Sequence, residues 1–167
     1  MEYYIIYQDD RIDNFAEPVG VSKVFKMDDL PVQFYIKEKK ENEYIDFIDK
    51  PVPLASEQLK NVFEIYEKNI FFKPVVLADK KRIKQDLYWL VVPEKRKCLS
   101  SETEFKKDGM IKRIVIDEKK VLESRVFLID DIKENFIIVN LDVAESILRR
   151  GLIGIKFKKI ETEAVKG

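Results

Sequence analysis

The sequence predicts an α+β protein: a mixed, largely antiparallel sheet with two amphipathic helices on one side and a β-rich N-terminal region. Two observations indicate the helices: residues 57–68 and residues 141–150 each follow a helix-capping residue, and each segment carries a stripe of apolar side chains at helical spacing. A third observation is that short apolar runs rich in β-branched and aromatic residues fill much of the remaining chain. We expect a single domain over residues 1–167, with residues 1–50 as the β-rich region and residues 52–160 as the α+β core.

The C-terminal helix is the clearest element. An apolar run, Phe136–Val139, precedes Asn140, whose side chain can accept a hydrogen bond from an unpaired amide of the first turn. The helix is expected to reach Arg150 and to stop at Gly151, before a strand at Ile155–Phe157. Its predicted apolar stripe consists of Leu141, Ala144, Ile147, Leu148 and Leu152. Such a stripe must be buried against another part of the fold.

A similar segment occurs earlier in the chain. Ser56 stands at the N-cap position before the predicted helix Glu57–Lys68, and an apolar strand follows. The stripe of this helix consists of Leu59, Val62, Phe63, Tyr66 and Ile70. Placing Ser56 over Asn140, at an offset of 84 residues, also aligns Phe63 with Ile147. This alignment suggests a cap–helix–strand unit used twice, and a coincidence between two common capped helices is the alternative.

Residues 1–50 are predicted to form a small antiparallel β region. Its expected strands are Tyr3–Tyr7, Val32–Lys37 and Tyr44–Ile48. Apolar and polar side chains alternate in the second of these strands, which indicates that one of its faces is exposed to water. The segment Lys50–Pro53 contains two prolines and is expected to be a stiff, extended connection to the core.

The centre of the chain holds the longest uninterrupted apolar run, Leu87–Val92, which ends at Pro93. A run of this kind is typical of a strand covered on both faces, so we expect it to be the central strand. Glu94–Lys107 is polar and is expected to be a loop with a short helical turn. Further strands are expected within Met110–Asp117 and at Val126–Ile129.

Composition excludes several functional classes. The 31 basic side chains balance the 31 acidic ones, so no net charge attracts nucleic acid or an anionic membrane over long range. A single cysteine, Cys98, excludes an internal disulfide framework. The first residues lack the features of a signal peptide, and no apolar run approaches the roughly 20 residues of a membrane span. We therefore expect a cytoplasmic protein that binds neither nucleic acid nor membrane.

A search for chemistry favours binding over catalysis. The chain contains no histidine, which removes the commonest general base and metal ligand. The five glycines are scattered and form no phosphate-binding loop. The acidic pairs at 9–10, 28–29 and 130–131 lie among turn-forming residues, and we interpret them as solvated turns. Cys98 and Trp89 are interpreted as core residues. We therefore predict no catalytic, cofactor or metal site.

Charge is nevertheless distributed unevenly along the chain. Residues 1–50 carry seven basic and twelve acidic side chains, whereas residues 73–125 carry fifteen basic and nine acidic ones. A solvated surface explains such asymmetry, and so does a charged face that meets a partner.

One family resemblance joins several of these segments. Their order along the chain is similar to that of the Imm11-type immunity protein family, formerly catalogued as a domain of unknown function. The segments that carry the resemblance are Leu87–Val92, Cys98–Ser101, Ile114–Asp117, Val126–Ile129, Phe136–Val139 and Arg149–Phe157. It covers about residues 52–160, and residues 1–50 fit only loosely. The acidic N-terminal region and Pro93, which closes the central strand early, depart from the family pattern.

The resemblance implies an antitoxin of a bacterial polymorphic toxin system. Such a protein binds a cognate toxin domain in the cytoplasm and neutralises it without catalysis. Since complementary charge speeds the association of tight complexes, we expect the acidic N-terminal region to face the toxin. The residues predicted to bind this partner are Asp9, Asp10, Asp13, Asp28, Asp29, Asp46 and Asp49.

Two alternatives belong to other functional classes. One is a small-ligand or regulatory domain, with an uncharacterised enzyme among its forms, that has a pocket between the sheet and the helices. The other is a structural module of a larger assembly, which would associate with itself.

Overall fold

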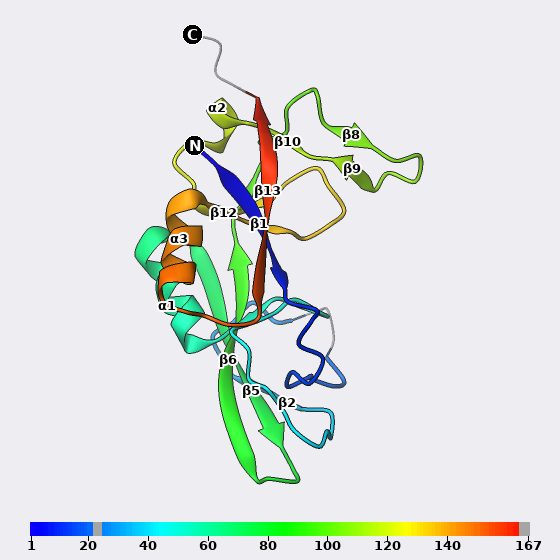
Figure 1. Ribbon diagram of the computed structural model, residues 1–167, viewed down its shortest axis with the longest axis vertical. Coiled ribbons are helices and arrows are strands. Elements are labelled where there is room, and N and C mark those ends of the chain that lie inside the picture. The colour runs from blue at the N-terminus through cyan, green and yellow to red at the C-terminus, as the bar shows by residue number, and fades with distance from the viewer. Residues whose placement is uncertain (22–24, 164–167) are drawn as a thin grey trace.

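The computed structural model describes residues 1–21 and 25–163. Its strands are β1 (Tyr3–Gln8), β2 (Val32–Tyr35), β3 (Phe47–Ile48), β4 (Leu54–Ala55), β5 (Ile70–Asp79), β6 (Lys84–Pro93), β7 (Lys95–Arg96), β8 (Glu104–Phe105), β9 (Ile111–Arg113), β10 (Val115–Asp117), β11 (Val126–Ile129), β12 (Ile137–Asn140) and β13 (Ile155–Glu163). Its helices are α1 (Glu57–Tyr66), α2 (Glu118–Val121) and α3 (Leu141–Arg149). The α+β class predicted from the sequence is confirmed (Figure 1).

The described strands form two main sheets, so the mixed, largely antiparallel pairing predicted from the sequence is confirmed but is divided between two sheets. The six-stranded sheet has the order β10-β13-β1-β12-β11-β7, and the five-stranded sheet has the order β2-β5-β6-β4-β3. Strands β8 and β9 form a separate ribbon. Most pairings are antiparallel, while β2–β5, β11–β7 and β10–β13 are parallel. Strand β6 lies at the centre of the five-stranded sheet, as predicted for Leu87–Val92.

Residues 1–50 do not form an antiparallel region of their own, which corrects the prediction. Strand β1 lies in the six-stranded sheet between β12 and β13. Strand β2 pairs in parallel with β5 of the other sheet, and the short β3 pairs with β4. Side chains alternate in burial along β2 as predicted. An alternating pattern identifies a half-buried strand but says nothing about its partner, because either direction of pairing satisfies it.

The two predicted cap–helix–strand units adopt the same arrangement. Ser56 Oγ accepts a hydrogen bond from Leu59 N at 3.2 Å, and Asn140 Oδ1 accepts one from Val143 N at 3.1 Å, so both predicted caps are confirmed. In each unit the strands before and after the helix flank a third strand that is antiparallel to both. That third strand is β6 between β4 and β5, and β1 between β12 and β13. The sequence alignment of the units therefore corresponds to a shared split β-α-β topology.

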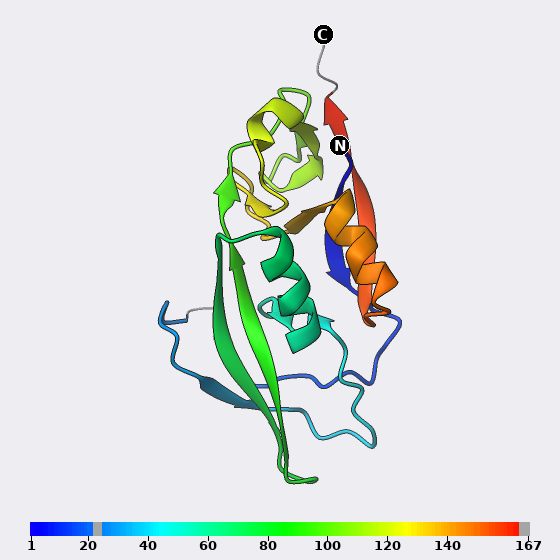
Figure 2. The ribbon, with the colours of Figure 1, turned by 90° about the vertical axis from the view of Figure 1, so that its left-hand side faces the viewer.

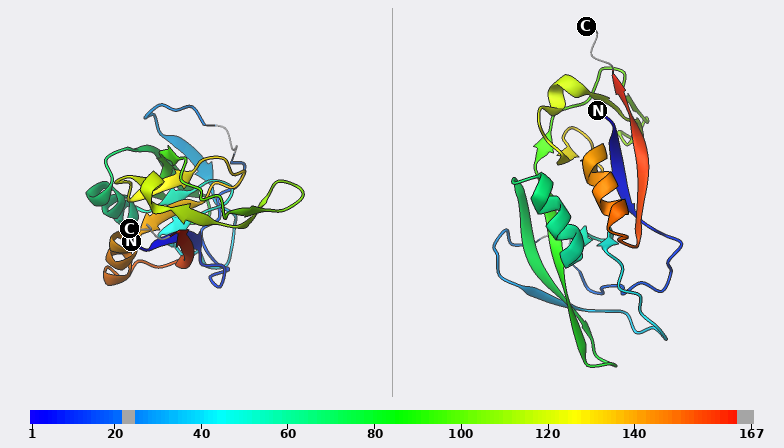
Figure 3. Two further views of the ribbon diagram at one scale, coloured as in Figure 1. Left: turned by 90° about the horizontal axis from the view of Figure 1, so that it is seen from above. Right: turned by 60° about the vertical axis from the view of Figure 1, so that its left-hand side comes forward.

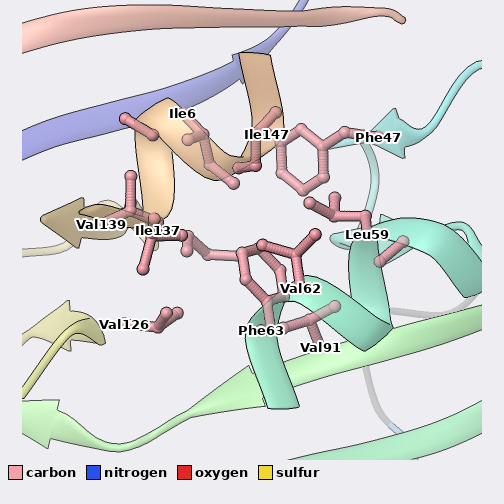
Figure 4. Packing of buried hydrophobic residues seen from close by; sticks show 13 residues of the cluster. Ile6, Phe47, Leu59, Val62, Phe63, Val91, Val126, Ile137, Val139 and Ile147 are labelled. Carbon is pink, nitrogen blue, oxygen red and sulfur yellow. The ribbon is translucent and has the colours of Figure 1, made fainter. Parts of the chain in front are cut away.

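Helices α1 and α3 lie side by side on one flank of the molecule (Figures 2 and 3). Their apolar stripes meet strands of both sheets in one buried cluster, which Figure 4 shows from close by. Its members include Leu59, Val62 and Phe63 from α1, Val143, Ala144 and Ile147 from α3, and Ile6, Phe47, Val91, Val126, Ile137 and Val139 from the strands. Core side chains thus fill the space between the helices and the sheets, where the alternative small-ligand hypothesis expected a pocket.

A second cluster covers the other face of the five-stranded sheet. There Val75, Leu77, Tyr88 and Leu90 pack against residues of the N-terminal segment, among them Ala16, Ile45 and Ile48. The buried Tyr88 hydroxyl donates to the carbonyl oxygen of Ile45 at 2.7 Å. The N-terminal segment is therefore an integral wall of the domain. A third cluster, which contains Cys98, lies on the six-stranded sheet.

Asp46 ties the two halves of the fold together. Its carboxylate accepts hydrogen bonds from the Ser56 hydroxyl at 2.6 Å and from the Ile153 amide at 2.7 Å. The first donor is the N-cap of α1 and the second belongs to the loop after α3. Next to this contact, the backbone of Gly154 packs directly on the buried Ile45. This junction fixes where β13 begins.

Several local predictions also need correction. Leu148 is 65% exposed and leaves the stripe of α3, because Val143, Ala144 and Ile147 already define the buried face. No helical turn is assigned within Glu94–Lys107, and the short helix α2 follows β10 instead. Trp89 is only half-buried: its Nε1 donates to Glu57 at 2.7 Å, and the Lys60 ammonium lies 4.5 Å from the centre of its ring.

Candidate functional site

A groove of about 870 Å³ lies between the two main sheets. Residues of β1, β12 and β13 form one side of it, and the segments 10–15 and 47–53 form the other. No residue of α1 or α3 lines it. The lining residues are Ile6, Tyr7, Gln8, Asp10, Ile12, Asp13, Phe15, Phe47, Asp49, Lys50, Pro53, Asn135, Phe136, Ile137 and Lys156.

The floor of the groove is apolar and aromatic. Ile6, Phe47 and Ile137 belong to the main buried cluster, so the floor is the outer surface of the core. Above it, the rings of Tyr7 and Phe136 meet edge to face, with centroids 6.0 Å apart. Burial, and then the nearby Asp49 carboxylate, raise the pKa of Tyr7, so its hydroxyl remains protonated at neutral pH. An apolar floor of this kind suits an aliphatic or aromatic group.

A pair of reciprocal hydrogen bonds holds the two sides of the groove together. The amide of Gln8 donates to Asp49 Oδ2 at 3.0 Å, and the amide of Asp49 donates to Gln8 Oε1 at 3.1 Å. Each side chain thereby accepts the hydrogen bond of the other residue's backbone amide, at a point where no strand pairing joins the two sheets. This clip fixes the width of the groove, because it connects the end of β1 to the segment after β3.

Charged side chains surround the rim. Asp10, Asp13 and Asp49 are acidic, whereas Lys50 and Lys156 are basic. Lys156 Nζ lies 2.7 Å from Asp10 Oδ1, and this hydrogen bond is the largest cause that lowers the pKa of Asp10. The side chain of Asp10 is 85% exposed, so it remains available to a partner. The rim thus combines the exposed carboxylates of Asp10 and Asp13 with the cations of Lys50 and Lys156.

Asp9 lies just behind the rim and is 7% exposed, which contradicts its interpretation as part of a solvated turn. Arg11 pairs with its carboxylate through two hydrogen bonds, donated by Nε at 2.9 Å and by Nη2 at 2.7 Å. Chiefly through these bonds, Arg11 lowers the pKa of Asp9 to about 2. Asp9 is therefore a structural anion that holds the turn after β1.

The structure separates the seven aspartates predicted to bind a partner. Asp10, Asp13 and Asp49 line the groove and Asp9 supports it. Asp28 and Asp29 lie in a different loop, where Asp28 pairs with Lys73. Asp46 is taken up by the junction described above. The seven residues thus form no single acidic surface, and only the group around the groove can act together.

Sequence reasoning missed the other half of this site. Phe136, just before β12, and Lys156, in β13, follow more than 120 residues after β1, and only the β1–β12 and β1–β13 pairings bring them to Asp10. Nothing in the sequence around either residue marks it as part of a site. The acidic excess of residues 1–50 was the single local signal, and it pointed to one side of the groove.

Two other features bear on chemistry. Cys98 is fully buried, and burial raises the pKa of its thiol to about 11, so the interpretation as a core residue is confirmed. Among residues 1–21 and 25–163, no three His, Cys, Asp or Glu side chains gather as a metal site would require.

None of the helices in that part of the chain has the length and apolar content to cross a membrane.

A second hollow, of about 1030 Å³, lies between the end of α1 and the segment that follows α2. Its polar groups are largely engaged with one another. Arg96 Nε donates to Ser124 Oγ at 2.6 Å, and the amide of Arg125 donates to Glu67 at 3.1 Å. The inter-sheet groove is the better candidate because an aromatic floor and exposed carboxylates converge there.

The chain matches no known protein family in a scan of family models, and a comparison with curated proteins finds no relative. The resemblance to the Imm11-type family therefore rests on the order of the segments quoted above and stays a prediction.

Proposed function

We propose that this chain is a bacterial immunity protein that binds a cognate polymorphic toxin domain in the cytoplasm and neutralises it without catalysis. The inter-sheet groove is its docking face. The observation that supports this face most directly is the convergence of Asp10, Asp13 and Asp49 on an aromatic floor.

The composition of the groove resembles the binding patch of a protein interface. Such patches combine a desolvated apolar centre, where a few anchor residues supply most of the binding energy, with a polar rim. The aromatic pair Tyr7 and Phe136 supplies the centre, and the exposed Asp10 and Asp13 supply the rim. The complementary toxin segment would insert an apolar side chain beside an arginine or lysine. The reciprocal hydrogen bonds between Gln8 and Asp49 already hold the two sides of the groove in place, so binding requires little additional ordering of the protein.

Capture and association kinetics test this proposal. The tagged protein should capture the product of the gene immediately upstream in stoichiometric amounts. The double variant Asp10→Lys, Asp13→Lys should slow association with that product by about tenfold at low salt, and by less at high salt. A matched control is Asp29→Lys with Glu41→Lys, because both residues are exposed and lie outside the groove.

The contrast between the two double variants decides the question. Equal association rates for both, in a folded sample, would remove the groove as the docking face. No capture by the folded wild-type protein would remove the toxin assignment itself.

A small-ligand function is the second candidate, because the groove volume of about 870 Å³ falls within the roughly 300–1000 Å³ of small-molecule sites. A thermal-shift screen of small cationic aromatic compounds would test it. A hit should lose its effect in the variant Tyr7→Ala, which removes one ring of the aromatic pair above the floor. If no compound in the screen raises the melting temperature, protein binding remains the proposed function of the groove.

A further inference from the structure

Lys73 occupies an unusual place in the five-stranded sheet. It lies on the face of β5 that also carries the buried Val75 and Leu77, and it is only 2% exposed. Moving an ammonium group out of water is costly unless an anion and hydrogen-bond acceptors accompany it. The structure supplies that compensation from outside the sheet.

The compensating groups come from one residue of the 26–31 loop. Lys73 Nζ lies 2.5 Å from Asp28 Oδ1 and 3.2 Å from the carbonyl oxygen of Asp28. The neighbouring side chains Met27 and Leu30 are 61% and 64% exposed, so the loop itself is held loosely by packing. The carboxylate of Asp28 is 39% exposed and can return to water.

Lys73 also forms one end of a pocket. The pocket measures about 370 Å³, and its remaining lining residues are Phe25, Lys26, Asp28, Leu30, Pro31, Val32 and Phe34. Phe25 and Phe34 form its aromatic wall, edge to face with centroids 6.0 Å apart. A buried cation at one end and apolar walls around it suit a molecule with one carboxylate and a short apolar body.

We propose that this pocket binds a small apolar monocarboxylate, whose carboxylate replaces that of Asp28 on Lys73. The exchange is electrostatically balanced, because one carboxylate leaves the ammonium as another arrives. The net gain comes from the apolar body of the ligand, which covers the aromatic wall. In the free protein Asp28 occupies the anion position and lowers the apparent affinity for any ligand. The pocket shares no residue with the inter-sheet groove, so this proposal is independent of toxin binding.

Benzoate is the probe for this site, and benzamide is its neutral match in shape. The variant Asp28→Ala vacates the anion position, and Asp29→Ala is the control because Asp29 is the exposed neighbour in the same loop. In thermal unfolding, Asp28→Ala should lower the melting temperature and benzoate should restore it. Benzoate should bind Asp28→Ala about tenfold more tightly than it binds the wild-type protein or the Asp29 control. Benzamide should have no effect on any variant.

The double variant Asp28→Ala, Lys73→Met shows whether Lys73 is the receptor. Its stability should not respond to benzoate. An equal response of the double variant, or an equal effect of benzamide, would overturn the proposal, as would no benzoate response in Asp28→Ala. Should Asp28→Ala not fold, Asp28→Asn keeps the shape of the side chain and removes its charge. A titration of the wild-type protein followed by NMR then decides: benzoate must shift the signals of Val32 and Phe34, and unchanged signals would refute the site.

Discussion

Replacing Gly154 by alanine should destabilise the protein far more than the same change at Gly151. Both glycines lie in the loop after α3 with positive φ, +82° at Gly154 and +64° at Gly151. A Cβ at position 154 would lie 2.4 Å from Cβ of Ile45, which is fully buried, whereas nothing lies within 4 Å of a Cβ at position 151. The pair therefore separates backbone strain from steric overlap.

The expected magnitudes follow from these two terms. A left-handed backbone costs an alanine about 1–2 kcal/mol at either position. Overpacking against the rigid core adds about 1–3 kcal/mol at position 154, which gives about 2–5 kcal/mol in all. Ile45→Ala should not rescue Gly154→Ala, because the closest contact is to the Cβ that alanine keeps.

Urea unfolding followed by circular dichroism measures both costs. The carbonyl oxygen of Gly154 also accepts a hydrogen bond from the Asp9 amide at 2.9 Å. A shift of this loop would therefore disturb the rim of the groove as well. Unfolding free energies that agree within about 0.5 kcal/mol for the two variants would refute the packing of this junction.

Three further predictions concern other parts of the structure. Asp46→Ala should lower the free energy of unfolding in urea by about 1–3 kcal/mol, because the Ser56 hydroxyl and the Ile153 amide both lose their acceptor. Ser56→Ala, which removes the helix cap, should lower it by about 1 kcal/mol. A smaller loss for Asp46→Ala than for Ser56→Ala would contradict the role of Asp46 in the junction. Because the folded pKa of Asp9 lies near 2, its pairing contributes stability above about pH 4 that disappears as pH falls through 2. Acid titrations of wild-type protein and Arg11→Gln should therefore converge below that window, and a constant difference would count against the pairing. Cys98 should react with iodoacetamide at pH 8 only after unfolding, since burial raises its pKa to about 11; rapid labelling of native protein would show that the thiol is accessible.

Local features of the fold could be predicted from the sequence. The side-chain caps at Ser56 and Asn140, the extents of the two long helices and the central position of Leu87–Val92 all depend on neighbouring residues and on periodicity. These signals are short-range, so they survive without knowledge of the tertiary structure.

Features that depend on pairing between distant segments could not be predicted. Strands β1 and β2 join partners more than 30 residues away, in two different sheets. For the same reason the aspartates of residues 1–50 looked alike in the sequence. Two of them differ from the rest because of distant partners: Asp28 meets the buried Lys73, and Asp46 meets the loop after α3. Composition located the acidic region, but only the fold shows which carboxylates are already in use.

Growth rescue in host cells is the measurement that tests the proposed function most directly. The product of the upstream gene would be induced together with wild-type protein, with the groove variant Asp10→Lys, Asp13→Lys, or with the control variant Asp29→Lys, Glu41→Lys. We expect growth with the wild-type and control proteins and loss of growth with the groove variant at equal expression. Growth arrest in the presence of well-expressed wild-type protein would contradict an immunity function, and full rescue by the groove variant would contradict docking at the groove.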